Sequence, residues 1–152
     1  MKCLYAVPIL SAALAMSAPL RAQPVTPSLA ACEAAPYVPA GEAPDLQGQW
    51  DFLMMVGETP SPGLMALGPM DGAYAGSLTP YRTNTVAVRR LTLDRGTVNM
   101  SVASREGEVR FEGHLTGRPD TMCGRVFYHG GQVLRMVAIR RPSNYVPRQA
   151  GQ

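Results

Sequence analysis

From Gly48 onward the chain alternates apolar and polar residues with a period of two, the pattern of half-buried β-strands. Trp50, Phe52, Met54 and Val56 fall on one face of the first such run. Glycine, proline and aspartate separate the runs at intervals of about 8–12 residues. The pattern predicts eight strands, which cover residues 48–56, 64–67, 73–79, 84–93, 98–102, 109–115, 121–128 and 132–141.

The predicted strands follow one another through short turns, and the sequence between them shows no convincing helix. An antiparallel sheet of this kind leaves two exposed edges unless it closes on itself. We therefore predict an all-β fold, an antiparallel up-and-down meander of about eight strands that forms a barrel over residues 45–141. A β-sandwich is the main alternative. Eight strands enclose an interior that side chains fill or that holds one small ligand.

Two strands carry signs of local irregularity. The apolar parity changes between Val88 and Leu91, which indicates a β-bulge at Arg89–Arg90. Gly76 interrupts the strand over 73–79, where it indicates a bulge or a close approach of another backbone.

The N-terminal residues have the features of an export signal. Lys2 supplies a positive charge, residues 4–20 are apolar and uncharged, and Ala22 offers a small residue for cleavage before Gln23. The apolar stretch is too short and too interrupted to form a membrane span, and no second one follows. We predict a signal peptide over 1–22, an exported protein in the periplasm or outside the cell, and no transmembrane segment.

Residues 23–44 form a leader rich in proline and alanine. Thr26-Pro27 can begin a short helix that ends before Pro36. Cys32 and Cys123 remain as an even pair once the signal is removed, so we predict a disulfide that ties this N-terminal strap to the barrel. The alternative is a lipidated Cys32 in an outer-membrane lipoprotein, because Leu29-Ala30-Ala31-Cys32 is similar to a lipobox. Residues 142–152 are a polar C-terminal tail.

Gly48-x-Trp50, on the first strand of an eight-stranded meander, resembles the lipocalin (calycin) superfamily. In that family the tryptophan plugs one end of the barrel and an arginine of the last strand packs across it. The resemblance implies this structural role for Gly48, Trp50 and Arg140, with Arg141 as the alternative arginine. Asp71-Gly72, Gly76-Ser77-Leu78 and Ala138-Ile139-Arg140 are similar to motifs of short exported bacterial proteins. The resemblance implies a fold far more than an activity.

The candidate ligand site is the barrel interior. Seven methionines follow the predicted signal, and Phe52, Met54, Met100 and Phe111 share the inward parity of their strands. Methionine suits an adaptable apolar site. We predict a non-enzymatic protein that binds a small apolar molecule or a lipid, without a metal, a cofactor or catalytic residues. The alternative is an interaction module, an inhibitor or accessory subunit whose loops 57–63 and 68–72 contact another exported protein.

Candidate chemistry elsewhere is sparse. Arg110, Glu112 and His114 share the outer face of one strand, and His129 lies in a turn beside two glycines. A hydrolase-like enzyme that uses His114 or His129 is the third hypothesis. The sequence leaves the oligomeric state undecided.

Charge is unevenly distributed along the chain. The full chain has a net charge of +3, yet residues 23–80 carry six acids and no arginine, whereas residues 81–152 carry 12 arginines and five acids. The basic half makes an anionic partner a further alternative. We do not expect nucleic acid, because no aromatic residues interleave with a basic stripe.

Overall fold

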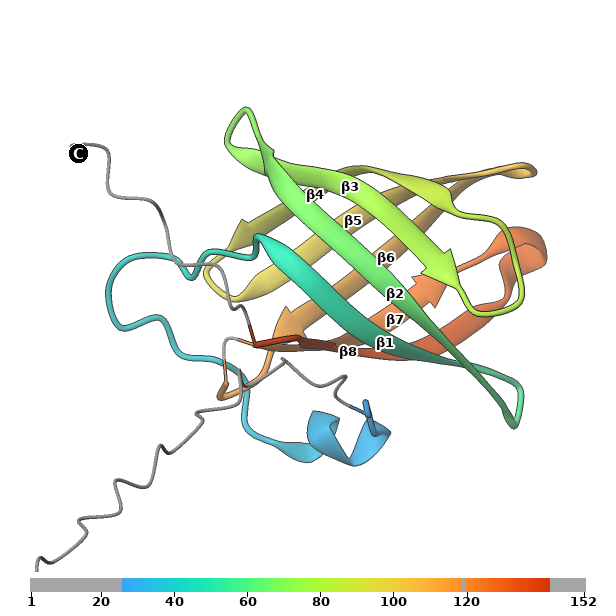
Figure 1. The fold of residues 1–152 in the computed structure, drawn as a ribbon. Coiled ribbons are helices and arrows are strands. Elements are labelled where there is room, and N and C mark those ends of the chain that lie inside the picture. The colour runs from blue at the N-terminus through green and yellow to red at the C-terminus, as the bar shows by residue number, and fades with distance from the viewer. Residues whose placement is uncertain (1–25, 119, 143–152) are drawn as a thin grey trace, which may run out of the picture.

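A computed structural model of the protein describes residues 26–118 and 120–142. The eight strands form a closed barrel in which each strand pairs antiparallel with the next and β8 pairs with β1 (Figure 1). Their bounds are β1 Gly48–Val56, β2 Thr59–Met70, β3 Ala73–Pro80, β4 Val86–Asp94, β5 Thr97–Ser104, β6 Gly107–Leu115, β7 Thr121–Phe127 and β8 Val133–Arg140. The predicted all-β, up-and-down barrel is confirmed, and the sandwich alternative is wrong.

The barrel has two ends that differ in character. The turns β2–β3, β4–β5 and β6–β7 lie at the end where β1 begins, which we call the closed end. The turns β1–β2, β3–β4, β5–β6 and β7–β8 lie at the opposite end, which we call the open end. Leader residues cover the closed end: the Tyr37 N–H donates to the Leu115 carbonyl at 2.9 Å, and Pro36 forms a bridge with Thr116.

The leader also runs outside β7 and β8 (Figure 1). Its short 3-10 helix η1, Leu29–Glu33, begins after Ser28, whose hydroxyl accepts a hydrogen bond from the Ala30 N–H at 3.3 Å. The predicted disulfide between Cys32 and Cys123 is confirmed and joins η1 to β7. Because this bond uses the sulfur that lipidation would modify, the structure favours the disulfide over the lipoprotein alternative.

β2 is longer than predicted. The sequence predicts a loop over 57–63, but residues 59–63 belong to β2, which pairs with β1 from Thr59 to Leu67. The prolines are tolerated for a geometric reason. The Pro62 carbonyl accepts from the Tyr81 N–H at 2.8 Å, so the backbone of Pro62, and of Pro60 two residues earlier, faces the side of β3. The β2–β3 pairing ends at Gly63 and Pro80, so neither nitrogen faces a strand that needs a donor.

The predicted irregularities are present. The β4–β5 register shifts between Val88 and Arg90, and the β3–β4 register shifts between Tyr74 and Gly76. A Cβ atom on Gly76 would overlap the backbone of Ala66 on β2. Gly76 is therefore glycine because a neighbouring backbone passes too close for a side chain.

Residues 1–25, with the predicted signal peptide, and residues 143–152, with nearly all of the predicted tail, lie outside the described residues. Among the residues that are described, none belongs to a helix long and apolar enough to cross a membrane.

Candidate functional site

The open end of the barrel contains a cavity of about 300 Å³. Its walls are mainly apolar side chains, which include Met54, Leu78, Met100, Phe111, Leu134 and Met136. They come from β1, β3, β5, β6 and β8, so the site requires the closed barrel. The volume is at the lower end of the range for small-molecule sites, and the mixture of a mostly apolar wall with a few polar groups is typical of them.

The closed end is filled. Trp50 is fully buried, and its indole N–H donates to the carbonyl of buried Leu46 at 3.0 Å. Other fully buried side chains pack in the same core cluster, among them Met65, Leu91 and Leu115. The interior is therefore packed at one end and hollow at the other, so a ligand would enter from the open end.

Arg140 lies over this plug. Its guanidinium carbon is 5.7 Å from the centroid of the Trp50 ring, and its Nη1 donates to the carbonyl of Asp45 at 2.5 Å. A Cβ on Gly48 would lie 3.6 Å from the Arg140 Cδ, and Gly48 has a φ of +133°, which disfavours any other residue. The Gly-x-Trp segment thus places an indole and leaves room for the arginine stem.

The alternative arginine has a different partner. Arg141 binds Asp51 through two hydrogen bonds, Nε to Oδ2 at 2.8 Å and Nη2 to Oδ1 at 2.7 Å. Only 8% of the surface of Asp51 is exposed. This bidentate pair links β1 to the residue after β8 on the outside of the barrel. The sequence pattern gives no sign of it, because the two residues are 90 positions apart.

Three of the four sequence-predicted ligand residues line the cavity: Met54, Met100 and Phe111. Phe52 does not. It is fully buried below the cavity, and its ring occupies the space that a Cβ on Gly63 would need. Phe52 and Gly63 are direct cross-strand partners, so the absent side chain makes room for the aromatic ring. The ligand-binding role of the other three residues stays a prediction.

A hydrogen-bonded pair at the open end was missed by sequence reasoning. Ser104, at the end of β5, lines the cavity, and its Oγ lies 2.7 Å from Nε2 of His129. His129 begins the short 3-10 helix η2, His129–Gly131, and its ring contacts that of Tyr128 at 4.7 Å between centroids. The sequence places His129 in a turn, and the structure shows that the residue is half-buried there.

The other histidine lies elsewhere. His114 is on the outer face of β6, where it pairs with Cys123 of β7, and does not line the cavity.

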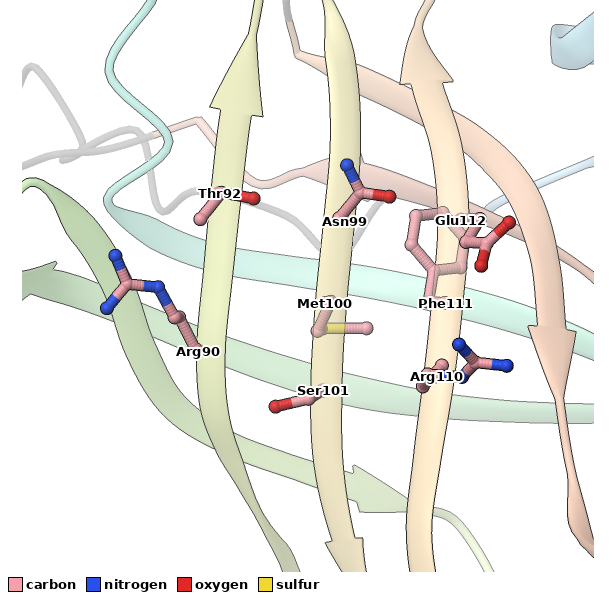
Figure 2. A pocket seen from close by; sticks show the side chains of 8 residues that line it. All are labelled: Arg90, Thr92, Asn99, Met100, Ser101, Arg110, Phe111 and Glu112. Carbon is pink, nitrogen blue, oxygen red and sulfur yellow. The ribbon is translucent and has the colours of Figure 1, made fainter.

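The neighbours of His114 on this face, Glu112 and Arg110, border a shallow outer hollow of about 260 Å³ together with Arg90, Asn99 and Ser101 (Figure 2). The guanidinium groups of Arg90 and Arg110 extend in opposite directions in Figure 2, and that of Arg110 lies 5.9 Å from the Phe127 ring centroid. The hollow therefore has no convergent pair of cations for an anion.

Within residues 26–118 and 120–142, no group of three or more His, Cys, Asp or Glu side chains is placed to hold a metal ion.

Apolar residues are also exposed around the open end. Val56, Tyr81, Tyr128 and Val133 all lie in or beside its turns. Val56 and Tyr81 border a further open hollow with Pro60, Pro62 and Arg82. The cavity therefore opens onto a partly apolar surface.

No protein-family model matches the chain, and no curated protein matches it. Among solved structures, a redesigned β-barrel matches with a TM-score of 0.50 and 18% identity, over 64% of this chain and 92% of that one. A de novo designed fluorescence-activating β-barrel matches with a TM-score of 0.46 and 19% identity, over 62% and 93%. At 18% identity the first likeness shows the β-barrel fold alone.

Proposed function

We propose that this is a non-enzymatic, exported protein that binds a small apolar molecule in the cavity at the open end of the barrel. The observation that carries the proposal is the contrast within one interior: a packed core around Trp50 and an apolar hollow of about 300 Å³ above it. Met54, Met100 and Met136 line the hollow, and methionine side chains adapt to ligands of irregular shape. The exposed apolar rim offers a path from solvent to the cavity.

Two observations support the wider proposal. The Cys32–Cys123 disulfide is typical of an oxidising compartment, which agrees with an export signal over 1–22. The Gly48-x-Trp50 segment and Arg140 meet at the closed end, which agrees with a lipocalin-like barrel.

Binding of N-phenyl-1-naphthylamine, an uncharged apolar fluorophore, tests this function. We expect its fluorescence to rise on saturable binding to the folded protein. Val86→Phe places a ring at the mouth of the cavity, where Val86 is half-buried, and should weaken binding about tenfold or more, or over 1.4 kcal/mol. Val102→Phe blocks the same cavity from another strand. Val133→Phe is the matched control, because Val133 is 50% exposed and does not line the cavity.

The proposal fails if the folded protein does not bind the probe, or if Val86→Phe and Val102→Phe both bind it as well as Val133→Phe does. Thermal unfolding of each variant establishes that the comparison is between folded proteins.

An interaction module is the second candidate, favoured by the exposed Val56 and Tyr81 beside an open hollow. The two segments first assigned to it do not form one surface. Both segments overlap β2: residues 57–63 include its start at the open end and residues 68–72 include its end at the closed end, so the turns at its two ends lie about 35 Å apart. A partner would therefore use the open end. Tyr81→Asp should then abolish co-elution with an exported partner and leave the fluorophore affinity unchanged, because Tyr81 is exposed and does not line the cavity.

A further inference from the structure

The polar groups of the cavity lie at its mouth. Its polar lining residues are Ser61, Thr83, Ser104, Tyr128 and Gln132, which belong to the open-end turns or to strand positions close to them. No aspartate, glutamate, lysine or arginine is among the described residues that line it. The site therefore combines an apolar depth with an uncharged polar rim, a shape that matches an amphiphilic molecule entering with its apolar end first.

Ser104 is the most constrained group of this rim. Its Oγ is 2.7 Å from His129 Nε2 and accepts a hydrogen bond from the Glu106 N–H at 3.2 Å. The turn that carries His129 is closed by the Tyr128 N–H, which donates to the Gln132 carbonyl at 2.8 Å, and by Gly130 with a φ of +66°. The rim hydroxyl is thus held between the β5–β6 and β7–β8 turns.

The free donor or acceptor site of the Ser104 hydroxyl determines which ligand groups it can bind. A hydroxyl has one donor and two acceptor sites, and the Glu106 N–H occupies one acceptor. If the hydroxyl donates to His129 Nε2, one acceptor site is left. If Nε2–H donates instead, both acceptor sites are occupied and the hydroxyl proton is left. A ligand group that both donates and accepts, such as an alcohol, is satisfied in either tautomer, whereas a carboxylate is satisfied only in the second.

The uncharged lining of the cavity also favours an alcohol over a carboxylate. An ionised carboxylate drawn into this mouth loses hydration and finds no cationic lining residue to replace it. An alcohol loses less hydration and recovers a hydrogen bond. We infer that the cavity takes an uncharged amphiphile with an aliphatic chain and a hydroxyl head, which hydrogen-bonds to Ser104 while His129 positions that serine; the inference rests on the proposed function.

Displacement of N-phenyl-1-naphthylamine by ligands of equal chain length tests this inference. 1-Decanol, sodium decanoate and decyltrimethylammonium are compared at pH 8, where decanoate is ionised. We expect 1-decanol to displace the fluorophore at a concentration about tenfold lower than either ion, because the ions lose hydration that the rim does not replace. Ser104→Ala should weaken 1-decanol about threefold to tenfold, the loss expected of one neutral hydrogen bond.

Two further variants separate the loss of the hydrogen bond from other effects of substitution. Ser104→Thr retains the hydroxyl and should retain the preference for 1-decanol, which separates lost hydrogen bonding from altered packing. Ser101→Ala, on the outer face of the same strand, is the matched control. Equal displacement by 1-decanol and decanoate, or an unchanged preference in Ser104→Ala, overturns the hydroxyl inference while the apolar site stands. Failure of the fluorophore to bind the wild-type protein overturns the proposed function instead.

Discussion

Trp50 and Arg140 are direct register partners across the seam where the first and last strands of the barrel meet, and the guanidinium of Arg140 covers the indole. One pair thereby joins the two ends of the meander and plugs its closed end. The indole donates to the Leu46 carbonyl and the arginine donates to the Asp45 carbonyl, so both also hold the segment that joins the leader to β1. The closed end is a structural unit, and binding is expected at the other end.

Replacing Trp50 tests the plug. Trp50→Ala removes the largest fully buried side chain, and we expect it to lower the free energy of unfolding by about 3–5 kcal/mol. Trp50→Phe keeps part of the apolar volume and should be less destabilising. Urea unfolding followed by circular dichroism measures both. A near-neutral Trp50→Ala would contradict the plug.

Gly63 leaves space for the ring of Phe52. A Cβ at this position would overlap the ring and would also lie 2.6 Å from the Thr79 carbonyl oxygen. We therefore expect Gly63→Ala to lower the free energy of unfolding by about 1–3 kcal/mol through overpacking. Gly68 in the same strand has open space around its missing Cβ, so Gly68→Ala is the matched control. Equal midpoints in chemical denaturation for the two variants would show that the ring moves aside freely.

The Asp51–Arg141 pair should contribute more than an exposed ion pair. Asp51→Asn keeps the side-chain shape but removes the charge, and we expect a loss of about 1–3 kcal/mol in the free energy of unfolding. The control is Asp94→Asn, which breaks the Arg95–Asp94 contact, whose side chains are 88% and 78% exposed. Its unfolding midpoint should not move, because exposed pairs contribute little. If the two substitutions change the free energy of unfolding equally, the Asp51–Arg141 pair contributes no more than an exposed pair.

Tyr74 should make the closed end sensitive to alkaline pH. Burial, the largest influence, raises the pKa of Tyr74 above its ordinary value of 10.0, against a hydrogen bond to the Leu46 backbone that lowers it. The folded pKa thus exceeds the unfolded one, so the stability it contributes is complete below pH 10 and is lost as pH rises through the folded value. Unfolding midpoints measured across this range should fall more steeply for the wild type than for Tyr74→Phe. Parallel profiles would contradict this assignment.

The disulfide should anchor η1 without holding the rest of the leader. In the Cys32→Ser/Cys123→Ser double variant we expect cleavage after Glu33 by a glutamyl endopeptidase to accelerate about tenfold, because local opening of η1 becomes easier. Glu42 lies outside η1 and near the segment that remains hydrogen-bonded to the barrel, so cleavage there is the internal control. If the two sites accelerate equally, the disulfide stabilises the whole leader.

Much of the fold follows from local pattern. Alternation of period two identifies seven strands nearly to their bounds, and the parity change at Arg89–Arg90 marks a real bulge. The strand predicted for β2 is too short because prolines ordinarily end strands. Whether a proline is tolerated depends on which side its nitrogen faces and where the neighbouring strand stops, and both are properties of the assembled sheet.

The candidate site was only partly predictable for a similar reason. The alternation along the first strand predicts that Phe52 and Met54 both point inward, but it does not predict how deep in the barrel each side chain lies. Depth depends on the register and tilt of the strands, which bury Phe52 beside Gly63 and leave Met54 at the cavity. The contact between Ser104 and His129 joins the end of β5 to the β7–β8 turn, 25 residues apart, and no local pattern records it.

The sequence by itself determined the strand alternation, the antiparallel order and the cysteine pairing, because these depend on residue type and spacing along the chain. Tertiary structure alone decided which end of the barrel is filled, which inward residues face a cavity, and which polar groups meet at its mouth. Those features arise only when β1 and β8 close the sheet in one register, since closure sets the depth of every inward side chain at once.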